Sequence, residues 1–197
     1  MTGVGIRSFE EPPYNRREIL RYAQCPGCAD DATVRIMEEC IKECDTFASF
    51  SYRVSYIELP IVSLDTNSGD IDFDLLKIKS RDLARNLDGC GMAVLFAATV
   101  GPGIDRLIRK YSKLDPVRAL FMQAIGAERA ESLCNGFCSS YPQKLRARFS
   151  PGFGDLPLDI QPRVLQLTNA TKNLSVTLDG GCLMSPTKSV TAFAGIE

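Results

Sequence analysis

Apolar side chains along this chain follow two different spacings, and each spacing predicts a different kind of element. In residues 30–45 they recur every three or four positions, which predicts an amphipathic helix capped by one of the two aspartates at its start. In residues 50–56 aromatic and branched side chains alternate with polar ones, which is typical of a half-buried strand. Residues 92–100 are the longest apolar run, and we expect a strand that is buried on both faces.

Capping residues and prolines indicate where the other helices begin. Asn15, Ser80 and Asp159 are expected N-cap residues of three short helices. Asp115 followed by Pro116 is a strong helix start, and this helix should be the longest. The predicted helices cover residues 15–22, 80–89, 104–111, 115–139 and 159–168.

The remaining segments predict short strands and turns. Strands are expected at residues 71–73, 174–178 and 190–194. The glycines at 101 and 103 indicate a structural turn rather than a dinucleotide-binding loop, because the third glycine of that motif is missing. Strands and helices mix without regular βαβ alternation. We therefore predict an α+β fold, with a mainly antiparallel, twisted sheet and flanking helices.

The length of 197 residues suits one domain with an extension. Residues 1–14, which end shortly after two prolines, are expected to be a loose N-terminal arm. Residues 15–197 are then a single domain, and residues 15–46 are its helical N-terminal part.

Charge and hydropathy exclude several classes of protein. The chain has 23 Lys and Arg against 24 Asp and Glu, so its net charge of -1 offers no field to attract nucleic acid or an anionic membrane. No apolar run reaches the ~18 residues of a membrane-spanning helix. The N-terminus also lacks the basic and apolar regions of a secretory signal. We expect a cytoplasmic protein that binds neither nucleic acid nor membrane.

Histidine is absent, which limits the chemistry more than any other feature of the composition. The chain cannot form a Ser-His or Cys-His nucleophile pair, and no imidazole is present to bind zinc or cobalt. Any chemistry must come from carboxylates, arginine, lysine, tyrosine, cysteine or a bound cofactor.

The eight cysteines allow two interpretations. Four of them have a spacing that would suit zinc or an iron–sulfur cluster: Cys25, Cys28, Cys40 and Cys44. Cys40 and Cys44 also fall on the apolar face of the helix predicted at 30–45, so we favour core positions over a metal site. The other four are expected to be small core residues: Cys90, Cys134, Cys138 and Cys182.

The segment 148–157 (RFSPGFGDLP) carries the strongest candidate for ligand binding. Its glycines allow a ligand to approach the main chain closely, and its prolines restrict the path of the backbone. Arg148 supplies a planar set of donors that suits a carboxylate or a phosphate. By itself this pattern fits either an anion-binding loop or a tight connection with a surface arginine.

Four segments resemble the activation domain of cobalamin-dependent methionine synthase, in particular its short, free-standing form. The Arg148 loop is similar to that family's Arg-x-x-x-Gly-Tyr region. Residues 184–191 (MSPTKSVT) are similar to its Met-x-Pro-x-x-Ser-Val-Ser segment. Residues 80–84 (SRDLA) and 93–102 (AVLFAATVGP) resemble the short members, and the likeness extends over about residues 15–196.

The resemblance implies a site for S-adenosylmethionine (AdoMet) in a shallow groove. Arg148 would hold the ligand carboxylate, and Glu131 on the long helix would face its ammonium or sulfonium group. The implied AdoMet-contacting residues are Arg148, Phe149, Ser150, Gly152, Phe153 and Glu131, with Glu128 as the alternative to Glu131 and Asp155 as a possible contact to ligand or partner. Phe149, Ser150 and Gly152 would line the site with main-chain groups. Phe153 replaces the family's usual tyrosine, which keeps a flat face without the hydroxyl. We find no counterpart of the family's N-terminal aspartate.

The resemblance also implies a function and partners. The protein would support reductive methylation of cob(II)alamin on a separate cobalamin-dependent methionine synthase or other corrinoid protein, with a flavodoxin-like electron donor. It would take part in methyltransferase chemistry, with AdoMet as its own cofactor and cobalamin arriving only on the partner. The alternative is a non-catalytic interaction or regulatory protein that keeps the fold without productive AdoMet binding.

Overall fold

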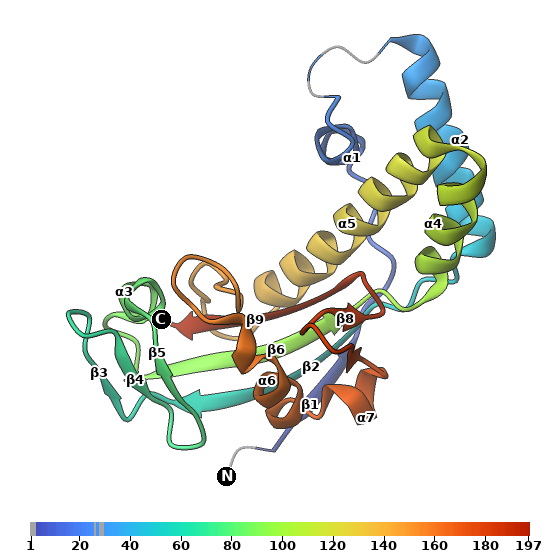
Figure 1. The fold of residues 1–197 in the computed structure, drawn as a ribbon. Coiled ribbons are helices and arrows are strands. Elements are labelled where there is room, and N and C mark those ends of the chain that lie inside the picture. Colours follow the sequence, from blue (N-terminus) through green and yellow to red (C-terminus); the bar gives the residue numbers. More distant parts are fainter. Residues whose placement is uncertain (1–2, 26, 28–29) are drawn as a thin grey trace.

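The computed structural model describes residues 3–25, 27 and 30–197. Its centre is a four-stranded sheet in the order β1-β2-β6-β9 (Figure 1). The strands are β1 (Gly5–Ser8), β2 (Arg53–Pro60), β6 (Met92–Thr99) and β9 (Ser189–Ile196). Every neighbouring pair in this sheet is antiparallel, and helices flank it. The predicted α+β class with a mainly antiparallel sheet is confirmed.

Strand β6 is buried on both faces, as its unbroken apolar sequence predicts. On one face Phe96 packs against helix α5 (Pro116–Ser139), with its ring centroid 4.9 Å from that of Phe137. On the other face Leu95 packs in a second cluster that includes residues of helix α3 (Arg81–Leu87). Two apolar layers therefore enclose the central strand.

Helices α1 (Arg16–Tyr22), α2 (Asp31–Phe47) and α4 (Gly103–Leu114) lie beside α5, away from most of the sheet (Figure 1). The predicted N-cap residues are confirmed where a side-chain oxygen accepts a main-chain N–H at the start of a helix: Asn15, Asp30, Ser80 and Asp115. Among the residues that the structure describes, no helix combines the length and apolar character needed to cross a membrane.

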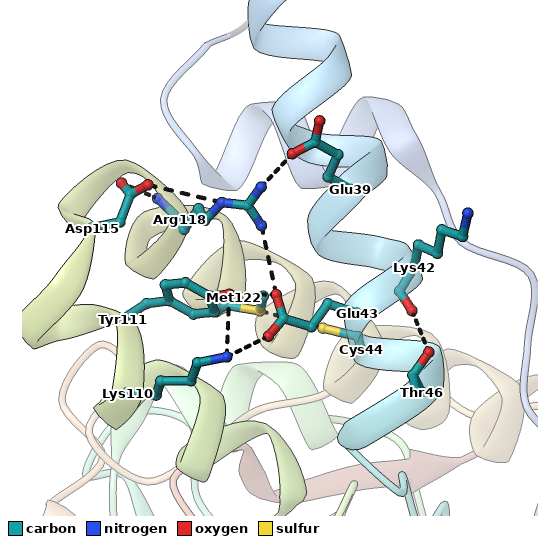
Figure 2. A network of polar contacts seen from close by, with 10 residues as sticks. All are labelled: Glu39, Lys42, Glu43, Cys44, Thr46, Lys110, Tyr111, Asp115, Arg118 and Met122. Atoms are coloured by element: carbon teal, nitrogen blue, oxygen red, sulfur yellow. Dashed lines mark hydrogen bonds and ion pairs between the residues drawn. The ribbon is translucent and has the colours of Figure 1, made fainter.

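A polar network joins α2, α4 and α5 (Figure 2). The Glu43 carboxylate of α2 accepts hydrogen bonds from Lys110 Nζ at 2.9 Å and from the Tyr111 hydroxyl at 2.6 Å, both on α4. Arg118 of α5 approaches the same carboxylate at 3.5 Å. Such ion pairs add little stability by themselves, so the network supplements the buried apolar contacts among the three helices.

The turn before α4 is structural, as the missing third glycine indicates. A Cβ atom on Gly103 would lie 1.2 Å from the carbonyl oxygen of Ala48, at the end of α2. Only glycine lets the first turn of α4 approach the backbone so closely.

Smaller elements complete the fold. One three-stranded sheet contains β3 (Ser63–Leu64), β4 (Asp70–Asp72) and β5 (Lys77–Lys79), and one hairpin contains β7 (Thr177–Leu178) and β8 (Met184–Ser185). The short helical segments are η1 (Leu158–Ile160), α6 (Gln161–Leu167) and α7 (Ala170–Leu174). Buried residues of these elements pack on the face of the central sheet opposite α5.

The segment that was predicted as a loose arm contains an edge strand instead. Ile6 of β1 pairs with Ser55 of β2 in antiparallel register. Farther along, Arg129 of α5 donates hydrogen bonds to the carbonyls of Pro12 and Pro13. The residues of β1 are all at least partly exposed, so no run of buried apolar positions indicates a strand here. Main-chain bonding to the edge of β2 decides the conformation.

The prediction that Asp159 caps a helix is wrong. Asp159 lies inside the 3-10 turn η1, and α6 begins at Gln161 with Pro162 in its first turn. Proline suits this position because the first helical N–H groups need no partner within the helix.

The predicted strand at residues 174–178 is also mostly wrong. Leu174 ends helix α7, Ser175 has a left-handed conformation, and only Thr177–Leu178 is extended. Leu174 and Val176 are nevertheless both buried against the sheet. The alternating apolar pattern therefore reflects the burial of a helix end and the turn after it, and not a strand.

Candidate functional site

A groove of about 580 Å³ lies between the C-terminal half of α5 and the segment 145–153. Its lining residues are Glu131, Asn135, Cys138, Leu145, Arg146, Ala147, Arg148, Ser150, Phe153 and Val190. The segment is held along the edge of β9, because Arg146 N–H donates to the Gly195 carbonyl at 2.9 Å and Phe149 exchanges two main-chain hydrogen bonds with Phe193. The central sheet thus fixes one wall of the groove, and α5 forms the other.

Arg148 is the principal cation of this groove. Its Nη2 donates to Glu131 Oε2 at 2.8 Å and to Asn135 Oδ1 at 2.8 Å. Glu131 and Asn135 are one helical turn apart on α5, so both reach the same guanidinium. The Arg148 side chain is 20% exposed, which leaves part of it open to the groove. The structure therefore brings together the two residues predicted to bind the two charges of an amino acid.

The loop that follows Arg148 contributes an exposed aromatic ring. Phe153 is 69% exposed, and its ring meets the Phe149 ring edge-on, with centroids 5.8 Å apart. Ser150 also lines the groove. Gly152 and Gly154 have positive φ angles of 85° and 52°, which explains the two glycines at these turn positions.

Two of the predicted main-chain contacts have partners within the protein. The N–H and the carbonyl of Phe149 both pair with Phe193, and the N–H of Gly152 donates to Leu156 at 2.9 Å. Of the described residues predicted to contact AdoMet, Phe149 and Gly152 lie outside the groove lining. Their N–H groups close the loop and join it to β9, a role that only the tertiary pairing reveals.

Asp155 has a structural role that its local sequence did not suggest. Its carboxylate accepts hydrogen bonds from the Ser80 hydroxyl and from the N–H groups of Arg81 at 2.8 Å and Asp82 at 3.2 Å. These bonds hold the pKa of the Asp155 carboxyl below its usual value, with the Ser80 bond as the largest cause. Asp155 thereby joins the loop to the first turn of α3, where a carboxylate is favourable.

Glu128 faces away from the Arg148 groove. It is buried and accepts from Arg129 Nε at 2.6 Å, from the Ser132 hydroxyl at 2.6 Å and from the Asn15 N–H at 3.3 Å. Glu131 and Asn135 border a smaller cavity of about 200 Å³ beside α1, which Glu128 also lines. Among the two candidate carboxylates, Glu131 is the one in contact with Arg148.

Among the described residues, no group of three or more His, Cys, Asp or Glu side chains is placed to hold a metal ion. Cys40 and Cys44 are buried in the core, where Cys44 Sγ lies 3.4 Å from Met122 Sδ (Figure 2). Burial raises the pKa of Cys40 to about 11, which keeps its thiol protonated. Cys28 lies outside the described residues.

Of the four cysteines expected in the core, Cys134 is fully buried, whereas Cys90, Cys138 and Cys182 are half-buried. Burial raises the pKa of Cys134 to about 12 and also raises that of Cys138. Both thiols are therefore protonated and poor nucleophiles near neutral pH.

Asn135 and Cys138 are groove residues that sequence reasoning missed. Asn135 follows Glu131 by four positions on one predicted helix, so the two side chains lie on the same face. This four-residue spacing was the sequence feature that could have identified Asn135 as a neighbour of Glu131. Whether the face meets Arg148 is decided by the path of the segment after α5.

Comparisons with known proteins identify the fold. No family model matches the chain, and no curated protein sequence matches it. Its structure is similar to a crystal structure of the MetH reactivation domain bound to AdoHcy, with a TM-score of 0.69 and 12% sequence identity. The likeness covers 99% of this chain and 78% of that chain. The chain therefore has the fold of the MetH reactivation domain.

Proposed function

We propose that this protein binds AdoMet in the Arg148 groove and presents it for reductive methylation of cobalamin carried by a separate protein. The partner is a cobalamin-dependent methionine synthase or another corrinoid methyltransferase. The observation that carries the proposal is the Arg148–Glu131 pair in the groove wall, in the fold of a domain whose crystal structure contains AdoHcy.

The groove has the size and the charges that an amino-acid nucleotide needs. A volume of about 580 Å³ falls within the usual range of small-molecule sites. Arg148 suits the ligand carboxylate, and Glu131 suits its ammonium. The exposed ring of Phe153 offers a flat apolar surface at the edge of the groove.

The chemistry requires little from the protein beyond orientation. Bound AdoMet would donate its sulfonium methyl group to the one-electron-reduced corrinoid on the partner, which would leave AdoHcy and a methylated corrinoid. This chain holds the two charged ends of the amino acid and limits access of water along one side. Because the chain has no histidine to bind cobalt, the corrinoid and its cobalt ligand come from the partner. A flavodoxin-like protein supplies the electron.

Titration calorimetry with AdoMet tests the binding step. We expect measurable binding by the wild-type protein and at least about tenfold weaker binding by Arg148→Ala, because a charged hydrogen bond is worth roughly 1.5–3 kcal/mol. Arg85→Ala, which removes an exposed arginine of α3, is the matched control and should bind as the wild type does. Absence of wild-type binding, or equal binding by Arg148→Ala, would refute the proposed site.

The activation step is tested with a cobalamin-loaded methionine synthase that lacks its own activation domain. After addition of AdoMet and a reduced flavodoxin, the cob(II) absorbance should fall only when this protein is present. Arg148→Ala should slow that change. If the wild-type protein binds AdoMet but the absorbance stays constant, the activation role is wrong while the binding site stands.

A second function has one observation in its favour. The N–H groups of Phe149 and Gly152 are used within the protein, so fewer main-chain donors face the groove than the resemblance implies. This favours an interaction or regulatory protein without productive AdoMet binding. Calorimetry separates the two functions, because only the first requires AdoMet to bind.

A further inference from the structure

Asn135 is a neutral partner of the central arginine. Its Oδ1 accepts from Arg148 Nη2 at 2.8 Å, the same distance and the same nitrogen that Glu131 uses. A guanidinium Nη carries two N–H groups, so each acceptor can take one of them. The Arg148 guanidinium is thus held at a single nitrogen by one charged and one neutral side chain.

We propose that Asn135 is a positioning residue, which keeps the Arg148 guanidinium aimed at the groove while Glu131 exchanges partners. This inference rests on the proposed function for the identity of the ligand. The ligand carboxylate takes the Nη2 position that Glu131 occupies in the structure, and Glu131 then turns to the ligand ammonium. Asn135 keeps the second N–H of Nη2, so the guanidinium holds its orientation during the exchange.

The positioning role requires an uncharged side chain at position 135. A second carboxylate at this position would also hold Nη2, but it would neutralise Arg148 and repel the incoming carboxylate. An amide oxygen orients the guanidinium without cancelling its charge. Asn135 also borders the groove and the small cavity beside α1, which places it where the amino-acid end of the ligand would lie.

The positioning role predicts for which ligands the loss of Asn135 will weaken binding. AdoMet has a carboxylate for Arg148, decarboxylated AdoMet lacks only that group, and 5′-methylthioadenosine lacks the whole amino acid. Asn135→Ala should bind AdoMet up to about tenfold more weakly, because the Arg148 guanidinium is then no longer held in place and must be ordered when the ligand binds. Its affinities for decarboxylated AdoMet and 5′-methylthioadenosine should stay within about twofold of wild type, because neither ligand has a carboxylate for the Arg148 guanidinium to bind.

Two further variants test the positioning role by the same calorimetric measurement. Asn135→Asp keeps an acceptor for Nη2 but adds a charge, so it should also lose AdoMet affinity. Ser139→Ala, one helical turn farther along α5, is the matched control and should bind like the wild type. Equal losses for all three ligands in Asn135→Ala would indicate a general structural defect and overturn the positioning role. Wild-type affinity in Asn135→Asp would overturn the requirement for a neutral group.

A measurement without ligand separates this inference from the proposed function. By nuclear magnetic resonance, the Arg148 guanidinium of the wild type should rotate slowly about its Nε–Cζ bond, and its signal is assigned by its loss in Arg148→Lys. Rotation should become faster in Asn135→Ala and stay slow in Ser139→Ala. Unchanged rotation in Asn135→Ala would overturn the inference. Failure of the wild type to bind AdoMet, with the rotation changed as expected, would instead overturn the proposed function.

Discussion

Asp155 illustrates how one side chain connects the groove loop to a distant helix. Its carboxylate accepts hydrogen bonds from the N–H groups of Arg81 and Asp82, which lie in the first turn of α3 and have no partner within the helix. The loop 150–157 is closed by its own main-chain bonds, and Asp155 anchors it to a second element. The position of Phe153 at the groove therefore depends on a residue that does not itself line the groove.

Removing this carboxylate should lower stability in a pH-dependent way. Because hydrogen bonds depress its folded-state pKa, Asp155 stabilises the fold fully above its unfolded pKa of about 3.9, and this contribution is lost as the pH falls through the lower folded pKa. Asp155→Ala should have a lower urea midpoint than wild type above about pH 5, and the difference should shrink in acid. Asp159→Ala is the control, and a similar loss in that variant would contradict this assignment.

At the scale of elements, α5 carries both the packing and the site. Its N-terminal half contacts α2 and α4 through apolar residues and through Arg118. Farther along, Phe137 packs on β6, while Glu131 and Asn135 point to the Arg148 segment. A helix of 24 residues is long enough to reach from the helical group to the sheet (Figure 1).

The close approach of α4 to α2 can be tested with a pair of glycines. Gly103→Ala should destabilise the protein by at least about 2 kcal/mol, because the added Cβ would overlap the Ala48 carbonyl oxygen. Gly136→Ala is the matched helical variant, with nothing within 4 Å of its Cβ, and it should stabilise the protein by about 0.5–1 kcal/mol. Urea unfolding measures both changes. Wild-type stability in Gly103→Ala would show that the two helices are not in such close contact.

At the scale of the whole molecule, a buried ion pair connects segments that are far apart in the sequence. Glu128 and Arg129 are almost fully buried, and together they bind the main chain at Pro12, Pro13 and Asn15. The N-terminal segment and α1 are thereby fixed beside α5, where α1 forms one side of the small cavity next to the groove. The groove itself is lined by the central part of the chain and by Val190 of β9, while the N-terminal part borders the small cavity next to it.

The sequence by itself determined the elements whose signals are local. Asn15, Ser80 and Asp115 cap helices because a side chain bonds to an N–H group two or three residues away. The apolar run 92–100 specified a central strand because only a position between two layers buries every side chain. Arg148 was identifiable as an anion-binding candidate because its residue type and the glycines beside it are local features.

Tertiary structure alone decided the features that depend on distant partners. Strand β1 forms through main-chain bonds to β2, which its side chains do not encode. Asp155 finds its partners 73 to 75 residues away, and Asn135 meets Arg148 because β9 guides the segment after α5. Hydrogen bonds of this kind depend on which surfaces the fold brings together, so no spacing within the sequence could reveal them.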